Sequence, residues 1–262
     1  MLWPHSVASG DGFEPYLETT LLDNVDRPIG LVAVLPGGGY CNRAPHEATP
    51  IAEKFNQLGF HSVVIQYRTS PSRFPEPQRD ALRAIKIIRA NAEKWRVDPD
   101  KIALLGFSAG GHLAASCGTI FEEVSTDCGD SVDAFSGRPD AMVLCYPVIS
   151  ITEDFGHQGS GKNLLGEERF AEPEARRFDL EHRVTAATPP AFIWHTATDG
   201  GVSVKNSLAF AEAMWAQHLT ASLHVFPEGR HGLGLAPEYP DIRRWPELAA
   251  DFLVASCAFP IA

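Results

Sequence analysis

Gly106-Phe107-Ser108-Ala109-Gly110 is the stretch of this 262-residue chain that decides its fold. The apolar run 102–105 precedes it, and the small-residue stretch 111–115 follows it. A strand, a tight turn and a helix in this order form the setting in which a G-x-S-x-G turn presents an exposed serine hydroxyl. The flanking glycines let the strand and the helix approach each other closely. Ser108 is therefore the candidate nucleophile.

Apolar runs alternate with amphipathic stretches along the rest of the sequence. This alternation is typical of βαβ units, and it predicts an α/β fold with a mostly parallel central sheet of about eight strands and helices on both faces. The chain contains no repeats and no linker-like stretches, so we expect a single domain over residues 1–262. The candidate strands are 16–22, 30–35, 60–67, 101–106, 141–146, 191–196 and 222–226.

Helical patterns fill the gaps between these strands. We expect Thr49 to cap one helix, with Pro50 at its first helical position. Other helices are expected over about 77–95, directly after Ser108, over about 203–217 and over about 241–257. The long segment 147–190 follows a strand, and we expect it to form a cap or insertion over the site.

The composition excludes several classes of partner. The chain has a net charge of −11, whereas phosphate recognition needs a basic surface, so no nucleic acid partner is expected. No apolar run reaches transmembrane length, and the N-terminal stretch lacks the basic and apolar regions of a signal peptide. We therefore expect a cytoplasmic protein without a membrane partner. Its scattered cysteines predict reduced thiols rather than disulfides or a zinc site: Cys41, Cys117, Cys128, Cys145 and Cys257.

Ligands of open α/β sheets bind beyond the carboxyl ends of the strands. The loops after the strands ending near 35, 67, 106, 146, 196 and 226 should therefore share one functional edge. The loop 119–140 follows a helix instead, so we expect it at the opposite edge. Its carboxylates should form a solvated face: Glu122, Glu123, Asp127, Asp130 and Asp133.

A serine hydroxyl needs a base to accept its proton and an acid to orient that base. Among ten histidines, His231 follows the last strand in the glycine-flanked loop 227–232, so it is the candidate base, whereas His112 and His195 are expected to be structural. Asp199 follows the preceding strand and is the candidate acid. Glu228 is the alternative acid, although it lies too near His231 in the chain to come from a separate strand. The resulting order is serine, acid, histidine.

The glycine-rich stretch Pro36-Gly37-Gly38-Gly39-Tyr40 follows the strand 30–35. Glycines at this place expose backbone N–H groups to the negative charge that develops on a substrate oxygen. We expect Ala109 N–H to be one oxyanion-hole donor, and the N–H of Gly38 or Gly39 to be the other.

These motifs together resemble those of the α/β-hydrolases. More closely, they resemble the serine carbohydrate esterases known as acetylxylan esterases, which include bifunctional acetyl/feruloyl esterases. The resemblance implies hydrolysis of acetyl or small acyl esters on plant-cell-wall oligosaccharides by an α/β-hydrolase fold, without a metal or a cofactor. It covers residues 30–255 and rests on 36–40 with Glu47 and Pro50, 106–114, 163–166, 188–190 with 195–196, and 229–234.

The sequence also departs from this family. Relatives carry Asp-Asp-x-x-Val-Pro where this chain has Thr198-Asp199-Gly200-Gly201-Val202-Ser203, which predicts a more flexible acid loop. Three other functions stay open: a general short-chain carboxylesterase, a formamidase-like amidase, and a non-catalytic binding protein on a hydrolase fold.

The segment 147–190 is rich in charged residues, unlike the broad apolar face of a lipase lid. We therefore expect a small acyl pocket and a preference for acetyl esters of small molecules or oligosaccharides. The charged residues are Glu153, Asp154, Lys162, Glu167, Glu168, Arg169, Arg176 and Arg177.

Overall fold

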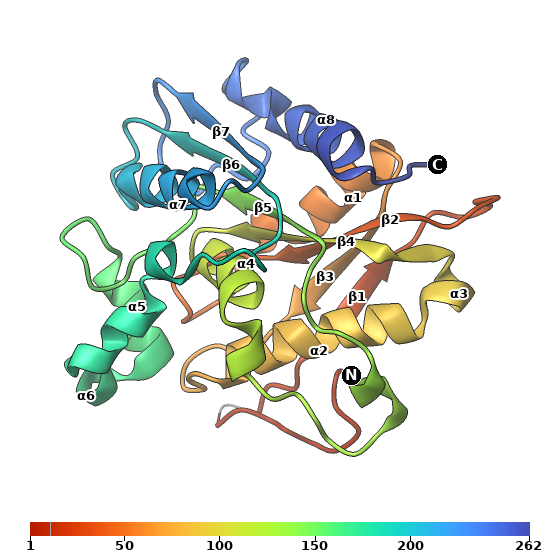
Figure 1. Ribbon diagram of the computed structural model, residues 1–262, viewed down its shortest axis with the longest axis horizontal. Helices are drawn as coiled ribbons and strands as arrows, with labels where there is room; N and C mark the ends of the chain where they lie inside the picture. Colours follow the sequence, from red (N-terminus) through yellow and green to blue (C-terminus); the bar gives the residue numbers. More distant parts are fainter. Residues whose placement is uncertain (11) are drawn as a thin grey trace.

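One sheet forms the centre of the computed structural model, which describes residues 1–10 and 12–262 (Figure 1). Seven strands of these residues lie in the order β1-β3-β2-β4-β5-β6-β7. β1 is antiparallel to β3, and all other neighbours are parallel, so the predicted α/β fold is confirmed. The strands are β1 Tyr16–Thr20, β2 Ile29–Leu35, β3 His61–Gln66, β4 Val97–Phe107, β5 Ala141–Cys145, β6 Ala191–Thr196 and β7 Ala221–Phe226.

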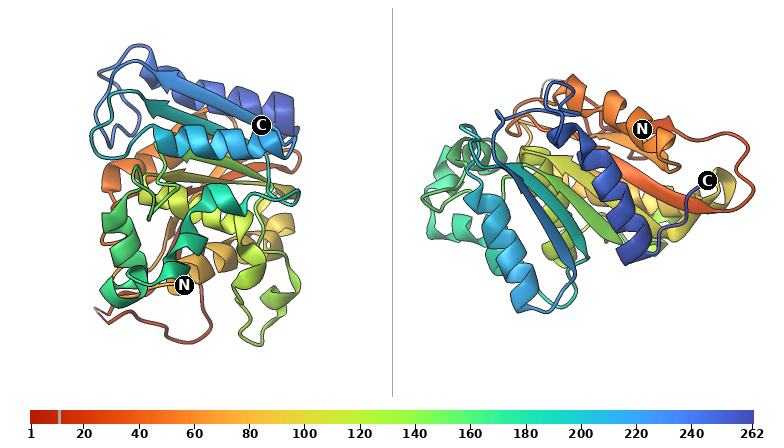
Figure 2. Two further views of the ribbon diagram at one scale, coloured as in Figure 1. Left: turned by 60° about the vertical axis from the view of Figure 1, so that its left-hand side comes forward. Right: turned by 90° about the horizontal axis from the view of Figure 1, so that it is seen from above.

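Helices cover both faces of this sheet, as the two views of Figure 2 show. Each face has its own apolar core, one beneath α1 and α8 and the other beneath α2, α4 and α7. The short α3 continues the chain after α2. The bounds are α1 Thr49–Gln57, α2 Glu76–Ala90, α3 Ala92–Trp95, α4 Ala109–Thr119, α7 Lys205–Ala216 and α8 Trp245–Cys257.

Strand β2 explains why the central strands are continuous apolar runs. All of its residues are buried. Leu31, Ala33 and Leu35 belong to the core beneath α2 and α4, whereas Val32 and Val34 belong to the core beneath α1 and α8. Side chains alternate across a strand, so a strand covered on both faces needs apolar residues at every position.

Three helices differ from the predicted ones. Thr49 is the first residue of α1 rather than its cap, and Pro50 occupies the first turn, where its ring is tolerated. The helix expected over 77–95 is divided into α2 and α3 at Asn91. The last helix begins at Trp245, after the 3-10 turn Ile242–Arg244.

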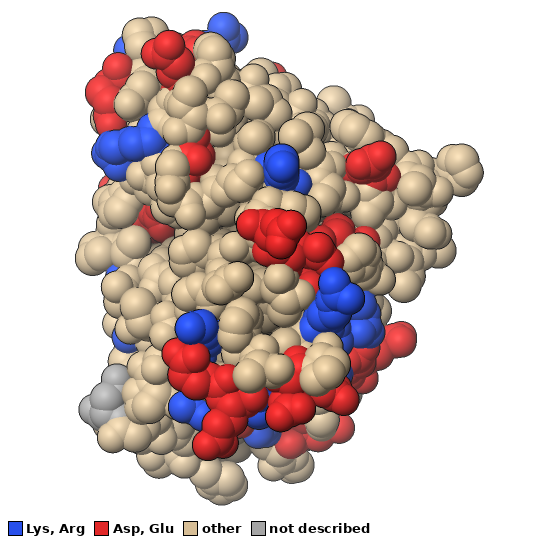
Figure 3. All heavy atoms as spheres, turned by 90° about the vertical axis from the view of Figure 1, so that its left-hand side faces the viewer, with Lys and Arg blue, Asp and Glu red and all other residues tan. Residues whose placement is uncertain are grey.

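Segment 147–190 forms two short helices, α5 (Gln158–Leu165) and α6 (Glu167–Phe170), followed by two 3-10 turns. Its apolar side chains Leu164, Phe178 and Leu180 are buried in the core beneath α2 and α4. Most of its charged side chains are exposed. Figure 3, which faces this side of the molecule, shows acidic and basic side chains gathered together over its lower half.

The loop 119–140 is only partly the solvated face that we expected. Asp130 and Asp133 form ion pairs with Arg83, whose side chain is 2% exposed. Glu123 pairs with two arginines of segment 147–190. Arg83 lies on α2, far away in sequence, so no pattern within the loop could have indicated these contacts.

All five cysteines are free thiols, as predicted, and Cys117 and Cys145 are buried. In the described part of the chain, no helix combines the length and the hydropathy that a membrane span requires.

Candidate active site

Ser108 occupies the turn between β4 and α4. Its backbone has φ 52° and ψ −119°, a conformation that costs energy in any residue other than glycine. The neighbouring glycines make this turn possible. A Cβ atom on Gly106 would collide with the backbone of Gly110, and one on Gly110 would collide with the backbone of Leu35. The motif therefore forms the strand–turn–helix arrangement that the sequence predicted.

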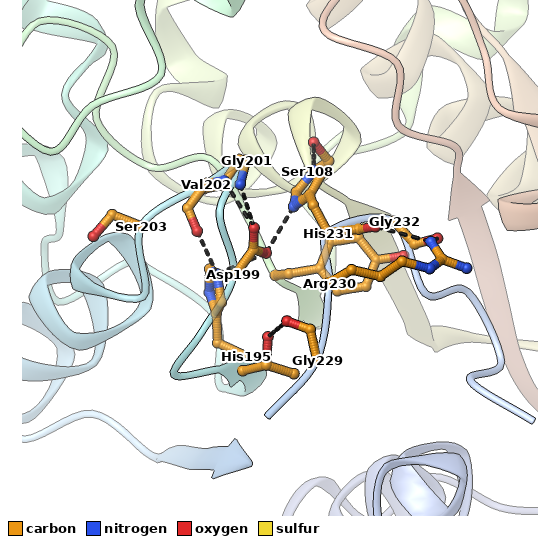
Figure 4. Close-up of polar contacts among 12 residues, drawn as sticks. Ser108, His195, Asp199, Gly201, Val202, Ser203, Gly229, Arg230, His231 and Gly232 are labelled. Atoms are coloured by element: carbon orange, nitrogen blue, oxygen red, sulfur yellow. Dashed lines mark hydrogen bonds and ion pairs between the residues drawn. The ribbon is translucent and has the colours of Figure 1, made fainter. Parts of the chain in front are cut away.

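Three side chains from separate loops form one hydrogen-bonded chain (Figure 4). His231 Nε2 lies 2.8 Å from Ser108 Oγ, and His231 Nδ1 lies 2.7 Å from Asp199 Oδ2. Asp199 follows β6 and His231 follows β7, and these strands are parallel neighbours. Their carboxyl ends thus deliver the acid and the histidine to the same edge of the sheet. The structure brings together the three residues that the sequence singled out.

The Asp199 side chain is 1% exposed and is held by several donors. Its Oδ1 accepts the N–H of Gly201 at 2.8 Å and of Val202 at 3.0 Å. Burial alone would raise the pKa of Asp199. Hydrogen bonds from His195, His231 and the Val202 backbone outweigh it and hold that pKa well below its ordinary value. The carboxylate therefore stays ionised, which suits an acid that must orient an imidazole.

His195 makes a contact that the sequence analysis missed. It is fully buried, as expected of a structural histidine, and its Nδ1 lies 2.7 Å from Ser207 Oγ. Its Nε2 lies 3.0 Å from Val202 O and 3.3 Å from Asp199 Oδ2. Both of these oxygens are acceptors, so Nε2 carries a proton and donates to them. The position of His195 at the end of β6, four residues before Asp199, is the signal that could have indicated this contact.

The loop 36–40 lies directly beside the nucleophile. A Cβ atom on Gly37 would lie 3.0 Å from Ser108 Cβ. The Gly37 N–H donates to Glu47 Oε2 at 2.8 Å, which leaves Gly38 and Gly39 as the loop's candidate oxyanion donors beside Ala109. Gly38 has φ 132° and Gly39 has φ 62°, both in the range that favours glycine. The loop thus keeps a conformation that side chains would strain.

Two expectations concern the surroundings of His231. Glu228, the alternative acid, is exposed, and Nδ1 of His231 contacts Asp199 instead. Gly201, expected to loosen the acid loop, also has a packing role, because a Cβ atom there would lie 2.9 Å from both Cβ and Cγ of His231. The missing side chain of Gly201 therefore makes room for the histidine. Gly200 faces open space and has no such role.

A comparison with models of known protein families identifies the family of this chain. The BD-FAE family model matches residues 17–214, a range that includes Ser108 and Asp199. This chain belongs to the BD-FAE family. This match, an acetylxylan esterase among the relatives and an acetyl ester-xyloside hydrolase among the solved structures together confirm the resemblance to carbohydrate esterases that the motifs suggested.

Two relatives of this BD-FAE chain have names that refer to xylan. Endo-1,4-beta-xylanase B of Butyrivibrio fibrisolvens is 39% identical over 229 residues, which are 86% of this chain and 35% of that protein. An acetylxylan esterase of Xylanibacter ruminicola is 31% identical over 214 residues, which are 80% of this chain and 42% of that protein. The chain therefore spans between a third and a half of the length of these relatives.

Solved structures match the BD-FAE chain over nearly its whole length. The acetyl ester-xyloside bifunctional hydrolase from Caldicellulosiruptor lactoaceticus is 40% identical, with a TM-score of 0.92, and the match covers 99% of this chain and 96% of that one. A carboxylesterase from Lactobacillus plantarum is 26% identical, with a TM-score of 0.78 and 95% of each chain covered. The fold is thus the α/β-hydrolase fold.

Proposed function

We propose that this BD-FAE protein is a serine esterase that hydrolyses acetyl esters through an acyl-enzyme. The observation that carries the proposal is the unbroken chain of hydrogen bonds from Ser108 Oγ through His231 to Asp199. Such a chain activates a serine hydroxyl that is otherwise a weak nucleophile. The names of its relatives, an acetylxylan esterase and an acetyl ester-xyloside hydrolase among them, support an ester as the substrate.

In the first half of the reaction, Ser108 Oγ attacks the ester carbonyl carbon while His231 Nε2 takes the hydroxyl proton. The carbonyl oxygen becomes an oxyanion, which the N–H groups of Ala109 and of Gly38 or Gly39 stabilise. When the tetrahedral intermediate collapses, the C–O bond to the alcohol breaks. His231 then returns its proton to the leaving oxygen, and Ser108 keeps the acyl group.

In the second half, a water molecule takes the place of the alcohol. His231 accepts a proton from it, the water oxygen attacks the acyl carbon, and the Ser108–acyl bond breaks as Ser108 Oγ regains a proton. Asp199 stays ionised throughout, and it stabilises the positive charge on His231 in each half. This cycle needs no metal and no cofactor.

We propose acetylated oligosaccharides derived from xylan as the substrate class. The xylan-related names of the relatives support this choice. The polar outer surface of segment 147–190 is compatible with a hydroxyl-rich ligand. A general short-chain carboxylesterase is the second candidate, supported by the structural match to the L. plantarum carboxylesterase.

Two experiments test the proposal. Ser108→Ala should remove turnover by several orders of magnitude while the protein stays folded, because nucleophile loss has cost about 10⁶ in kcat in a related mechanism. Activity within tenfold of the wild type would refute the mechanism. Comparing acetylated xylo-oligosaccharides, p-nitrophenyl acetate and formyl amides then decides the substrate, because a formamidase-like enzyme would prefer the amides.

A further inference from the structure

A buried carboxylate lies between the two loops that flank Ser108. Glu47, at the end of the 3-10 turn Pro45–Glu47, is 2% exposed. Its Oε2 accepts the Gly37 N–H at 2.8 Å, and its Oε1 accepts the Tyr146 hydroxyl at 2.6 Å. Burying a carboxylate is costly unless hydrogen bonds satisfy it. Here one of those hydrogen bonds comes from the loop 36–40 that carries the candidate oxyanion donors.

Tyr146 continues this connection to the loop of the catalytic histidine. Its hydroxyl oxygen accepts the Gly234 N–H at 2.9 Å, so the single hydroxyl proton goes to Glu47. Burial raises the pKa of Tyr146 well above its ordinary value, which keeps this proton in place. The Tyr146 ring also packs edge-on against His231, with 5.1 Å between the ring centroids.

The same 3-10 turn holds the histidine loop at a second point. His46 Nε2 lies 3.0 Å from Gly232 O. Trp245 Nε1 donates to Gly234 O at 2.9 Å, so both backbone groups of Gly234 are engaged. The backbone of the loop is therefore fixed on the C-terminal side of His231, by contacts to Gly232 and Gly234.

We propose that Glu47 and Tyr146 are positioning residues that fix the loop 36–40 and the His231 loop relative to each other. The inference rests on the proposed function and deepens it. Both side chains are buried, and their hydrogen bonds reach the two loops through the backbone N–H groups of Gly37 and Gly234. The nucleophile, the base and the oxyanion donors work together only at a set spacing, and a misplacement of about 1 Å can cost about 100-fold in rate.

Stability alone gives a weaker account of this network. Replacing a buried polar network by well-packed apolar side chains is often neutral or stabilising, so burial by itself does not call for a carboxylate and a phenol here. A network that joins backbone N–H groups of two separate loops sets the orientation of these loops relative to each other. Apolar packing cannot do this as well, because hydrogen bonds fix direction as well as distance.

The test uses two variants that change few atoms. Tyr146→Phe keeps the ring against His231 and removes only the hydroxyl. We expect kcat for p-nitrophenyl acetate to fall about 10- to 100-fold with little change in KM. Glu47→Gln cannot accept from both donors, because its NH2 group faces one of them, and should show a loss of similar size. The losses should not add in the double variant, since both changes break one network.

A trifluoromethyl ketone supplies a readout that a merely structural role would not move. Ser108 Oγ adds to its carbonyl carbon, the hydroxyl proton passes to His231, and the carbonyl oxygen becomes an oxyanion. In Tyr146→Phe and in Glu47→Gln, the inhibition constant of this ketone should rise by the same factor by which kcat/KM falls. Asp140→Asn is the matched control. Asp140 directly precedes β5, and its carboxylate accepts the Ile102 N–H at 2.9 Å. It therefore lies at the amino end of β5, whereas the site lies at the carboxyl ends of the strands. This variant should lower Tm without altering the kinetics.

The outcomes separate the two proposals. If Ser108→Ala keeps activity, the proposed function fails. If Ser108→Ala is inactive while Tyr146→Phe and Glu47→Gln are folded with wild-type kcat and inhibitor affinity, only the positioning inference fails. A kcat loss of equal size in Asp140→Asn would also overturn the inference, because it would trace the loss to general destabilisation. Should Tyr146→Phe not fold, Glu47→Gln decides alone.

Discussion

Four donors meet on the carboxylate of Asp199: the side chains of His195 and His231 and the backbone N–H groups of Gly201 and Val202. An ionised carboxylate at this place keeps a proton on His231 Nδ1, so Nε2 faces Ser108 as an acceptor. Burial of Asp199 favours its neutral form, and these hydrogen bonds together offset that cost and keep the carboxylate ionised.

Asp199→Asn tests this orientation. The amide NH2 would donate to His231 Nδ1 and leave the proton on Nε2, the wrong tautomer for a base. We expect kcat to fall by about 10⁴, with KM little changed, as for the equivalent change in a serine protease. Steady-state kinetics on p-nitrophenyl acetate measure it. Near-full activity in Asp199→Asn, combined with loss in Glu228→Gln, would show that the acid is Glu228.

The lowered pKa of Asp199 also predicts how stability depends on pH. A carboxylate with a depressed folded-state pKa contributes stability above its unfolded pKa of about 3.9 and loses it as pH falls through the folded value. The Tm difference between wild type and Asp199→Asn should therefore be largest above about pH 5 and shrink below about pH 4. Thermal melts over pH 3–7 measure this difference, and a gap that widens in acid would contradict the assignment.

At the scale of elements, the triad could be predicted because each residue follows directly on a strand. Ser108, Asp199 and His231 come after β4, β6 and β7, and parallel strands bring their carboxyl ends to one edge. Glu47 and Tyr146 could not be paired this way, since 99 residues separate them and only the finished fold brings them into contact. The division of the helix 77–95 was missed because a turn at Asn91 leaves the apolar period almost unbroken.

Helix α5 contacts the oxyanion loop directly. Asn163 Nδ2 donates to Gly39 O at 2.8 Å, so segment 147–190 helps to orient the peptide groups beside Ser108. We expect Asn163→Ala to lower kcat about 3- to 10-fold, the value of one hydrogen bond. Gln158→Ala is the matched control, because Gln158 lies exposed on the same helix. Equal kinetics in the two variants would mean that the contact to Gly39 does not matter for turnover.

The fold of the molecule could be predicted because its sheet is buried on both faces. Strands in such a sheet, like β2, appear in the sequence as continuous apolar runs. Segment 147–190 was harder to predict, since its turns and short helices depend on contacts with the rest of the chain. Phe178 O, for example, lies 2.9 Å from His112 Nε2 in α4. His112, which we expected to be structural, therefore anchors segment 147–190.

This anchoring leads to a prediction about substrate chain length. The apolar side chains of segment 147–190, such as Leu164, Phe178 and Leu180, are buried in the core, while most of its charged side chains are exposed. A lipase lid must instead present a broad apolar face to lipid. We therefore expect kcat/KM to fall steadily from p-nitrophenyl acetate through butyrate to octanoate, because a short acyl pocket rejects longer chains by steric clash. The rate should also show no jump where the ester exceeds its solubility. A profile that peaks at octanoate, or a clear jump at the solubility limit, would place the enzyme with lipase-like esterases and refute the acetyl preference.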